Sequence, residues 1–305
     1  MGIEFRIIVS RVVALGVVLS FSALGTGLLY AEGLDDFSTN SLREYNLATG
    51  RKPFVYSDAI GVGMMAGRLD LPKDDTNAGL VRSSSVGKLD RLNDSMSLSI
   101  YFRPLAQSNV SRVAYAGLGL GTDPVKMFNG FNGANSFEIQ VRSELNRSVY
   151  GMNEVGLRLR TYRGATTTNT FISRDDARVT LRAETWYQLV TTINLTDAKT
   201  FVVRSEIKDW GHDGISGGKT ILEDTSPEFS LERVEGVELY AGFFAGHQSG
   251  SNGGSSAVDD FEVSSEPVET TVLLLGWCAF LIRGPRIRTR SDVSADNPSS
   301  DLGFC

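Results

Sequence analysis

The sequence predicts an all-β protein that folds, between residues 32 and 265, as a two-sheet antiparallel jelly-roll sandwich. Polar and apolar residues alternate with a period of two along most of this stretch, which is typical of strands with one buried face. Turn-forming pairs such as Asn129-Gly130 and Asp213-Gly214 separate the alternating runs. Helical periodicity is nearly absent there. Each predicted sheet therefore has one apolar and one hydrated face, and the two apolar faces must meet in a common core.

The predicted strands follow one another at short intervals. In Ser95–Phe102 the apolar residues Met96, Leu98 and Ile100 lie on one side, and serines lie on the other. Further alternating runs are Ser136–Arg142, Val155–Arg160, Arg178–Arg182, Trp186–Asn194, Thr200–Ile207, Val237–Ala245 and Val258–Val263. No repeat of fixed period runs through them, so the pattern favours a sandwich over a β-helix or a propeller.

The composition excludes several classes of site. The chain of 305 residues has a net charge of −6, and its middle, 32–265, keeps all of that charge. Such a domain does not suit nucleic acid, whose binding requires concentrated positive charge. Both cysteines, Cys278 and Cys305, lie outside the middle, so the middle has neither a disulfide nor a thiolate metal site. The two histidines of the chain are too few for a histidine-rich metal centre.

The N-terminal residues have the pattern of a secretory signal. Arg6 and Arg11 precede an apolar run from Val12 to Leu29, and the small residue Ala31 follows it. We expect a signal peptide over residues 1–31 and therefore an exported protein. The alternative is a helix that stays in the membrane as an N-terminal anchor.

The C-terminal residues combine a proline element, a short apolar run and basic residues. Ser265-Glu266-Pro267 precedes the eleven residues Val272 to Ile282, and four arginines follow: Arg283, Arg286, Arg288 and Arg290. Eleven residues are too few for an ordinary membrane span, which needs about 20. This block, residues 266–290, resembles the PEP-CTERM sorting signal of Gram-negative bacteria.

That resemblance implies processing by an exosortase and delivery to the cell surface or the extracellular matrix. It also implies a short hydrophobic C-terminal helix, and we expect residues 291–305 to be a disordered tail. Only the terminal segments would then contact a membrane. A short hydrophobic anchor or a frayed tail is the alternative.

Three short motifs carry a second resemblance. The segment Glu184–Val190, which contains Trp186 and Tyr187, is similar to a strand of concanavalin A-like and laminin-G-like domains. The stretch Ala257–Val263 resembles the last strand of these domains, and Leu34–Phe37 resembles an opening strand of exported bacterial members. The resemblance covers roughly residues 33–264 and implies a concanavalin A-like jelly roll whose first and last strands lie side by side.

Asp-Asp-Phe occurs in both of these terminal strands. Neighbouring first and last strands would bring Asp36, Asp259 and Asp260 together, and clustered carboxylate oxygens suit Ca²⁺. We therefore expect a structural calcium site there. The alternative is a pair of solvated strand ends whose charges discourage edge pairing.

The predicted turn near residue 210 contains the candidate ligand-binding residues Asp209, Trp210 and His212. A sugar ring stacks well on an aromatic side chain, while nearby polar groups accept hydrogen bonds from its hydroxyls. The alternative is a hairpin turn in which Trp210 covers the core.

No catalytic constellation emerges from the sequence. Arg142-Ser143-Glu144-Leu145 and Tyr240–Gln248 resemble strands of jelly-roll alginate lyases, which implies acid–base chemistry by Tyr240 and His247. That family's Gln-x-His strand is missing. For a glycoside hydrolase, the nearest carboxylate pair, Glu235 and Glu238, is spaced to opposite faces of a strand.

We therefore predict a non-catalytic, exported surface protein that binds extracellular polysaccharide. The alternatives are a structural or adhesive matrix protein without glycan binding, and a polysaccharide lyase or glycoside hydrolase.

Overall fold

The computed structural model describes most of the predicted domain. The described residues are 33–72, 76–89, 94–105, 113–128, 134–143, 154–164, 166–173, 178–197, 199–232, 236–248 and 253–266, and all belong to one compact unit, Met1–Pro267. The predicted signal peptide, the sorting segment beyond Glu266 and the tail lie outside these residues. In the described part of the chain, no helix is long and apolar enough to cross a membrane.

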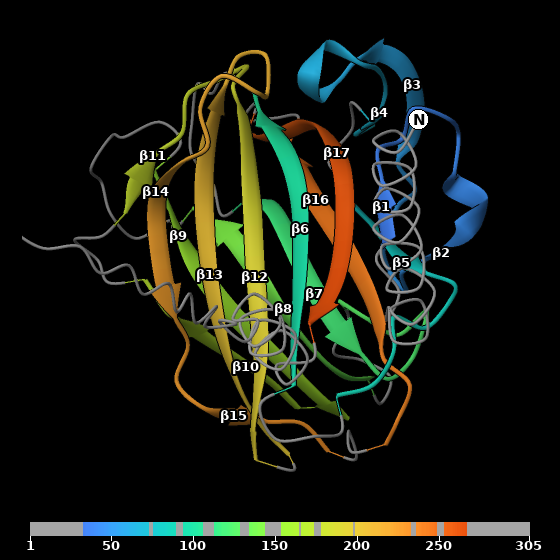
Figure 1. Cartoon of the computed structure of the whole chain (residues 1–305), viewed down its shortest axis with the longest axis vertical. Coiled ribbons are helices and arrows are strands. Elements are labelled where there is room, and N and C mark those ends of the chain that lie inside the picture. Colours follow the sequence, from blue (N-terminus) through green and yellow to red (C-terminus); the bar gives the residue numbers. More distant parts are fainter. Residues whose placement is uncertain are drawn as a thin grey trace, which may run out of the picture. The chain divides into compact units, whose positions relative to one another are not determined.

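Two antiparallel sheets form the domain, which confirms the predicted all-β sandwich (Figure 1). Sheet A contains β1 (Gly33–Asp35), β3 (Val55–Ile60), β4 (Ala66–Asp70), β6 (Ser95–Pro104), β12 (Trp186–Asp197), β13 (Thr200–Gly211), β14 (Lys219–Thr225), β15 (Phe229–Ser230) and β17 (Gly253–Glu266). Its central order is β14–β13–β12–β6–β17, and β1 and β4 pair with the free edge of β17. In Figure 1 these central strands lie side by side at the front.

Sheet B lies behind sheet A in this view (Figure 1). It contains β2 (Tyr45–Leu47), β5 (Thr76–Arg82), β7 (Ala114–Gly121), β8 (Ala134–Arg142), β9 (Glu154–Gly164), β10 (Thr166–Phe171), β11 (Val179–Thr180) and β16 (Tyr240–Gln248). The order is β2–β5–β16–β7–β8–β9, with β10 and β11 beside β9. Strands β16 and β17 pair where they meet, and so join the sheets at one corner. Two short 3-10 helices, Leu42–Glu44 and Val62–Met64, lie in the connections.

The core lies between the inner faces of the two sheets, as the period-two alternation predicts. On β6 the side chains of Met96, Leu98 and Ile100 are buried, and on β9 Leu157 and Leu159 are buried. Removal of this apolar surface from water contributes about 25 cal/mol per Å² to folding. The alternation therefore predicted which face of each of these strands turns inward.

The first and last strands pair, as the concanavalin A-like resemblance implied. Gly33 lies opposite Val263 and Asp35 lies opposite Phe261. This pairing brings Phe261 into a cluster of aromatic rings in the core. The ring centroids of Phe243 and Phe261 are 4.8 Å apart, and those of Phe37 and Phe243 are 6.0 Å apart.

The outer face of sheet B differs from the hydrated face that the alternation predicts. Ser136, Glu138 and Gln140 on β8 are all buried there. A second apolar cluster covers the neighbouring strands β7 and β16, and it consists of Ala48, Val81, Ala114, Met127, Phe128 and Phe244. The rings of Phe128 and Phe244 pack closely against β7 because the strand carries glycines on this face. A Cβ on Gly117 would lie 2.0 Å from Phe244 Cε1.

Gly117→Ala should therefore destabilise the domain by about 1–3 kcal/mol, since the added methyl group overpacks the Phe244 ring. The measurement is the urea midpoint. Gly156→Ala on β9 is the matched control, because its Cβ would meet nothing closer than 3.4 Å. Equal stability of the two variants would contradict this account of the outer face.

Candidate functional site

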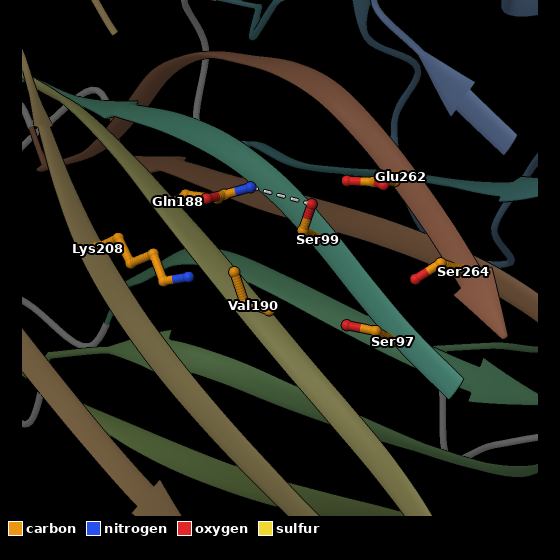
Figure 2. A pocket seen from close by; sticks show the side chains of 7 residues that line it. All are labelled: Ser97, Ser99, Gln188, Val190, Lys208, Glu262 and Ser264. Carbon is orange, nitrogen blue, oxygen red and sulfur yellow. Dashed lines mark hydrogen bonds between the residues drawn. The ribbon is translucent and has the colours of Figure 1, made fainter. Parts of the chain in front are cut away.

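The outer face of sheet A carries a shallow polar depression with about 190 Å³ of space that water can enter. Figure 2 shows the seven side chains that line it, which come from four adjacent strands: Ser97 and Ser99 from β6, Gln188 and Val190 from β12, Lys208 from β13, and Glu262 and Ser264 from β17. Most of them are hydrogen-bonding groups, which suits a ligand rich in hydroxyls.

Strand register brings these residues together. Ser99 on β6 lies opposite Val190 on one side and opposite Glu262 on the other. Lys208 lies opposite Gln188. Because side chains of one strand alternate between faces, each of these positions points away from the core. The serines of the alternating run Ser95–Phe102 were predicted on a hydrated face, but their partners on other strands were not.

An aromatic pair borders the depression. Trp210, at the end of β13, donates its Nε1–H to Gln188 Oε1 at 3.0 Å. The Nε2 of Gln188 in turn donates to Ser99 Oγ at 3.2 Å. The centroids of Trp210 and Tyr101 are 6.0 Å apart. Gln188 therefore fixes the orientation of the tryptophan ring and links it to the floor of the depression.

The structure places only one of the three predicted ligand-binding residues beside this depression. Trp210 borders it, whereas Asp209 alternates to the other side of β13 and binds Arg182, with Oδ2 2.6 Å from Nη2. His212 is exposed, and its Nδ1 is 2.7 Å from the carbonyl oxygen of Glu184. Asp209 and His212 thus tie the 209–212 turn to the loop before β12. Tyr101, Gln188 and Lys208 were missed because the sequence does not give the register.

Charges at the depression are of both signs. Lys208 Nζ is 3.0 Å from Glu206 Oε1 on the same strand, and its side chain extends towards the depression in Figure 2. Burial raises the pKa of Tyr101 to about 12, and the acidic groups of Asp260 and Glu262 add to the effect. The tyrosine is therefore neutral at physiological pH and acts as a hydroxyl donor or acceptor.

Of the aspartates predicted to bind calcium, Asp259 and Asp260 lie on β17 beside the β3–β4 connection, and Asp36 directly follows β1, which pairs with β17. Asp259 is buried, and its Oδ2 accepts a hydrogen bond from the Val62 N–H at 2.8 Å. Its Oδ1 accepts from Asp260 N at 3.0 Å, and Asp36 Oδ1 accepts from Ser38 N at 3.0 Å. Within the described ranges no group of three or more histidine, cysteine or acidic side chains is placed to hold a metal ion. Calcium at this position stays a prediction.

Burial and the proximity of other carboxyl groups raise the pKa values of Asp259 and Asp260. Burial raises the pKa of Asp259 to about 8, and Asp260 adds to this increase, while the Val62 N–H opposes it. Burial also raises the pKa of Asp260 to about 7, and Asp36 is the next largest cause. Both carboxyl groups are therefore partly protonated near neutral pH.

The residues named by the alginate lyase resemblance do not converge. Tyr240 and His247 are seven positions apart on β16, which corresponds to about 23 Å along a strand. Tyr240 lies opposite Gly121 on β7, whereas His247 lies opposite Gly254 at the corner between the sheets. The acid–base pair that this resemblance implied is not assembled here.

Solved structures of plant lectins have the same fold. Lectin II from Ulex europaeus matches with a TM-score of 0.50 and 11% sequence identity, over 78% of this chain and 100% of the lectin. The basic winged bean lectin with Tn-antigen matches with a TM-score of 0.50 and 11% identity, over 77% of this chain and 98% of the lectin. No protein-family model matches the chain, and no curated protein matches it either. At this identity the likeness shows the concanavalin A-like sandwich fold, as the sequence motifs implied.

The aspartate pair makes a pH dependence of stability testable. A folded pKa above the ordinary value of 3.8 means that the folded state binds protons which the unfolded state releases. Stability is therefore highest at low pH with respect to this group and declines up to about pH 8, by about 1.4 kcal/mol for each pKa unit of difference. Asp259→Asn keeps an acceptor for the Val62 N–H and should flatten the decline.

The measurement is the urea midpoint between pH 5 and pH 9, in EDTA and again in calcium chloride. Glu228→Gln, at an exposed carboxylate, is the control and should keep the full slope. A wild-type urea midpoint that does not change with pH in EDTA would contradict the raised pKa values of Asp259 and Asp260. Stabilisation by calcium that Asp260→Asn removes would support the predicted metal site.

Proposed function

We propose that this protein binds polysaccharide through the outer face of sheet A and has no catalytic activity. The observation that carries the proposal is the Trp210–Tyr101 pair beside the polar depression, in which the Trp210 indole donates a hydrogen bond to Gln188. An aromatic surface next to a few oriented polar groups suits a sugar ring, which has apolar faces and hydroxyl edges. The structural likeness to lectins supports a carbohydrate ligand only by analogy of fold.

The shape of the site suits part of a chain rather than a small enclosed ligand. The depression is open and is lined by side chains from four neighbouring strands, so a polysaccharide crossing the sheet can continue at either end. Ser97 and Ser264 lie at the end away from the aromatic pair. Their hydroxyls, together with Lys208 and Glu262, offer both donors and acceptors.

We also propose that the protein is exported and acts at the cell surface or in the extracellular matrix, with an exosortase-type machinery as its sorting partner. The support is the sequence of the two termini. Such a location would supply the extracellular polysaccharide that the domain binds.

Trp210→Ala should weaken binding of the best-bound neutral polysaccharide by at least tenfold, since an aromatic anchor residue contributes about 2 kcal/mol or more to an interface. A glycan array on the exported protein identifies the ligand, and calorimetry then compares the variants. Trp210→Phe keeps an aromatic ring without the Nε1–H, and it should lose less affinity than Trp210→Ala.

Tyr240→Ala is the matched aromatic control, because Tyr240 is a partly buried aromatic residue on sheet B. It should bind neutral polysaccharide as the wild type does. Failure of the wild type to bind any polysaccharide would overturn the proposal and favour a structural or adhesive role in the matrix.

A further inference from the structure

A second cavity, of about 290 Å³, lies at the end of the sandwich away from Trp210. Its lining residues come from β9 of sheet B, from the start of β13, and from β15 and the two residues after it: Arg163, Lys199, Ser230, Leu231 and Glu232. Lys199 directly precedes Thr200 on β13, and Thr200 is ten positions from Trp210, about 33 Å along a strand. In Figure 1 strand β15 lies at the lower end of the domain. This cavity is therefore separate from the aromatic pair on sheet A.

The segment 230–232 forms one wall of the cavity and is held to both sheets. Leu231 is buried, and its N–H donates to the carbonyl oxygen of Lys199 at 3.3 Å, at the start of β13. On the sheet B side, Asn135 Oδ1 accepts from the Glu232 N–H at 3.0 Å, and the Asn135 amide donates back to the Glu232 carbonyl oxygen. This wall is therefore in place before a ligand binds, which reduces the ordering cost of binding.

The same segment orients the guanidinium group of Arg163. Strand register places Arg163 on β9 opposite Asn135 on β8, so both side chains reach the segment. Arg163 Nη2 donates to Ser230 Oγ at 2.7 Å and also to the Ser230 carbonyl oxygen. Both acceptors are neutral, and among the described residues Arg163 has no carboxylate partner. Its Nε–H and Nη1–H groups have no acceptor there either, so they remain available to a ligand.

The other two charged groups of the cavity do not neutralise each other. Lys199 and Glu232 are both exposed, and neither forms an ion pair with a residue that the structure describes. The cavity therefore presents two cations and one carboxylate. Guanidinium and ammonium groups bind carboxylate oxygens, whereas the carboxylate of Glu232 accepts hydrogen bonds from hydroxyl groups. A ligand that satisfies all three groups has an anionic group on one side and hydroxyl groups on the other.

We infer that this cavity is a second binding site and that its ligand is a sugar acid, a sugar residue that carries a carboxylate group. Its volume of about 290 Å³ is close to the lower limit of about 300 Å³ for small-molecule pockets. Such a volume suits one or two sugar rings rather than a single small anion.

The charges select the same class of ligand. A neutral sugar would leave Arg163 and Lys199 without an anion, and a small anion would leave Glu232 without a hydroxyl donor. A sugar acid places its carboxylate at the two cations and its hydroxyls at Glu232 and Ser230. This site goes beyond the polysaccharide site proposed for sheet A and does not depend on it.

The test is an NMR titration of the full-length protein with glucuronate, methyl glucoside and acetate at one ionic strength. Glucuronate has both a carboxylate and a hydroxylated ring, whereas each of the other two probes has only one of these. We expect glucuronate to shift the backbone amide signals of Ser230, Leu231 and Thr200, and to bind at least tenfold more tightly than either other probe. Trp210→Ala should leave these shifts unchanged, which separates this site from the one on sheet A.

Arg163→Gln/Lys199→Gln should weaken glucuronate binding at least tenfold, because it removes both cations. Arg43→Gln/Lys219→Gln removes the same charge from exposed positions elsewhere and should change the affinity less than twofold. Equal losses in the two double variants would overturn the inference.

Acetate bound as tightly as glucuronate would also overturn the inference, since the cavity would then recognise an anion alone. Methyl glucoside bound as tightly would overturn it as well, since the two cations would then have no part in binding. Should Arg163→Gln/Lys199→Gln not fold, the wild-type titration decides, and glucuronate that leaves the Ser230 and Leu231 signals in place would contradict the inference.

Discussion

The pairing of strand β17 is the constraint on which the rest of this structure depends. Strand β17 begins beside β16 of sheet B. It then runs through sheet A between β6 on one edge and β1 and β4 on the other. The register is irregular between Asp259 and Glu262, where Asp260 takes a positive φ of 46°. This irregularity lets Phe261 enter the core while Glu262 lines the polar depression. One strand thus closes the core and completes the site.

The sequence predicted the fold well where a strand has one buried face. Alternation identified the inward side chains of β6, β9 and β12, and the terminal Asp-Asp-Phe motifs indicated the strands that pair at the edge. The sequence pattern did not predict β7. Its residues Ala114–Gly121 are buried on both faces of the sheet, so polar and apolar residues do not alternate along it. The sequence pattern also assigned Glu138 to a hydrated face, because the side chains that surround it, those of Tyr162, Arg160 and Arg51, are distant from Glu138 in the sequence but close to it in space.

The candidate sites were harder to predict because each of them depends on register between strands. Trp210 was identified from its turn, but Gln188 and Ser99, which fix its ring, come from two other strands. Asp209 and His212 are adjacent to Trp210 in sequence, yet alternation and the turn direct them to Arg182 and Glu184.

Chemical-shift mapping of the tryptophan indole N–H signals tests the sheet A site most directly. The chain has three tryptophans, of which Trp186 is buried and Trp210 borders the depression. Titration with the bound neutral polysaccharide should shift the Trp210 indole signal, which its hydrogen bond to Gln188 makes sensitive to contact, and should leave that of Trp186 in place. Binding that shifts neither Trp210 nor the amide groups of Gln188 and Ser99 would contradict the account.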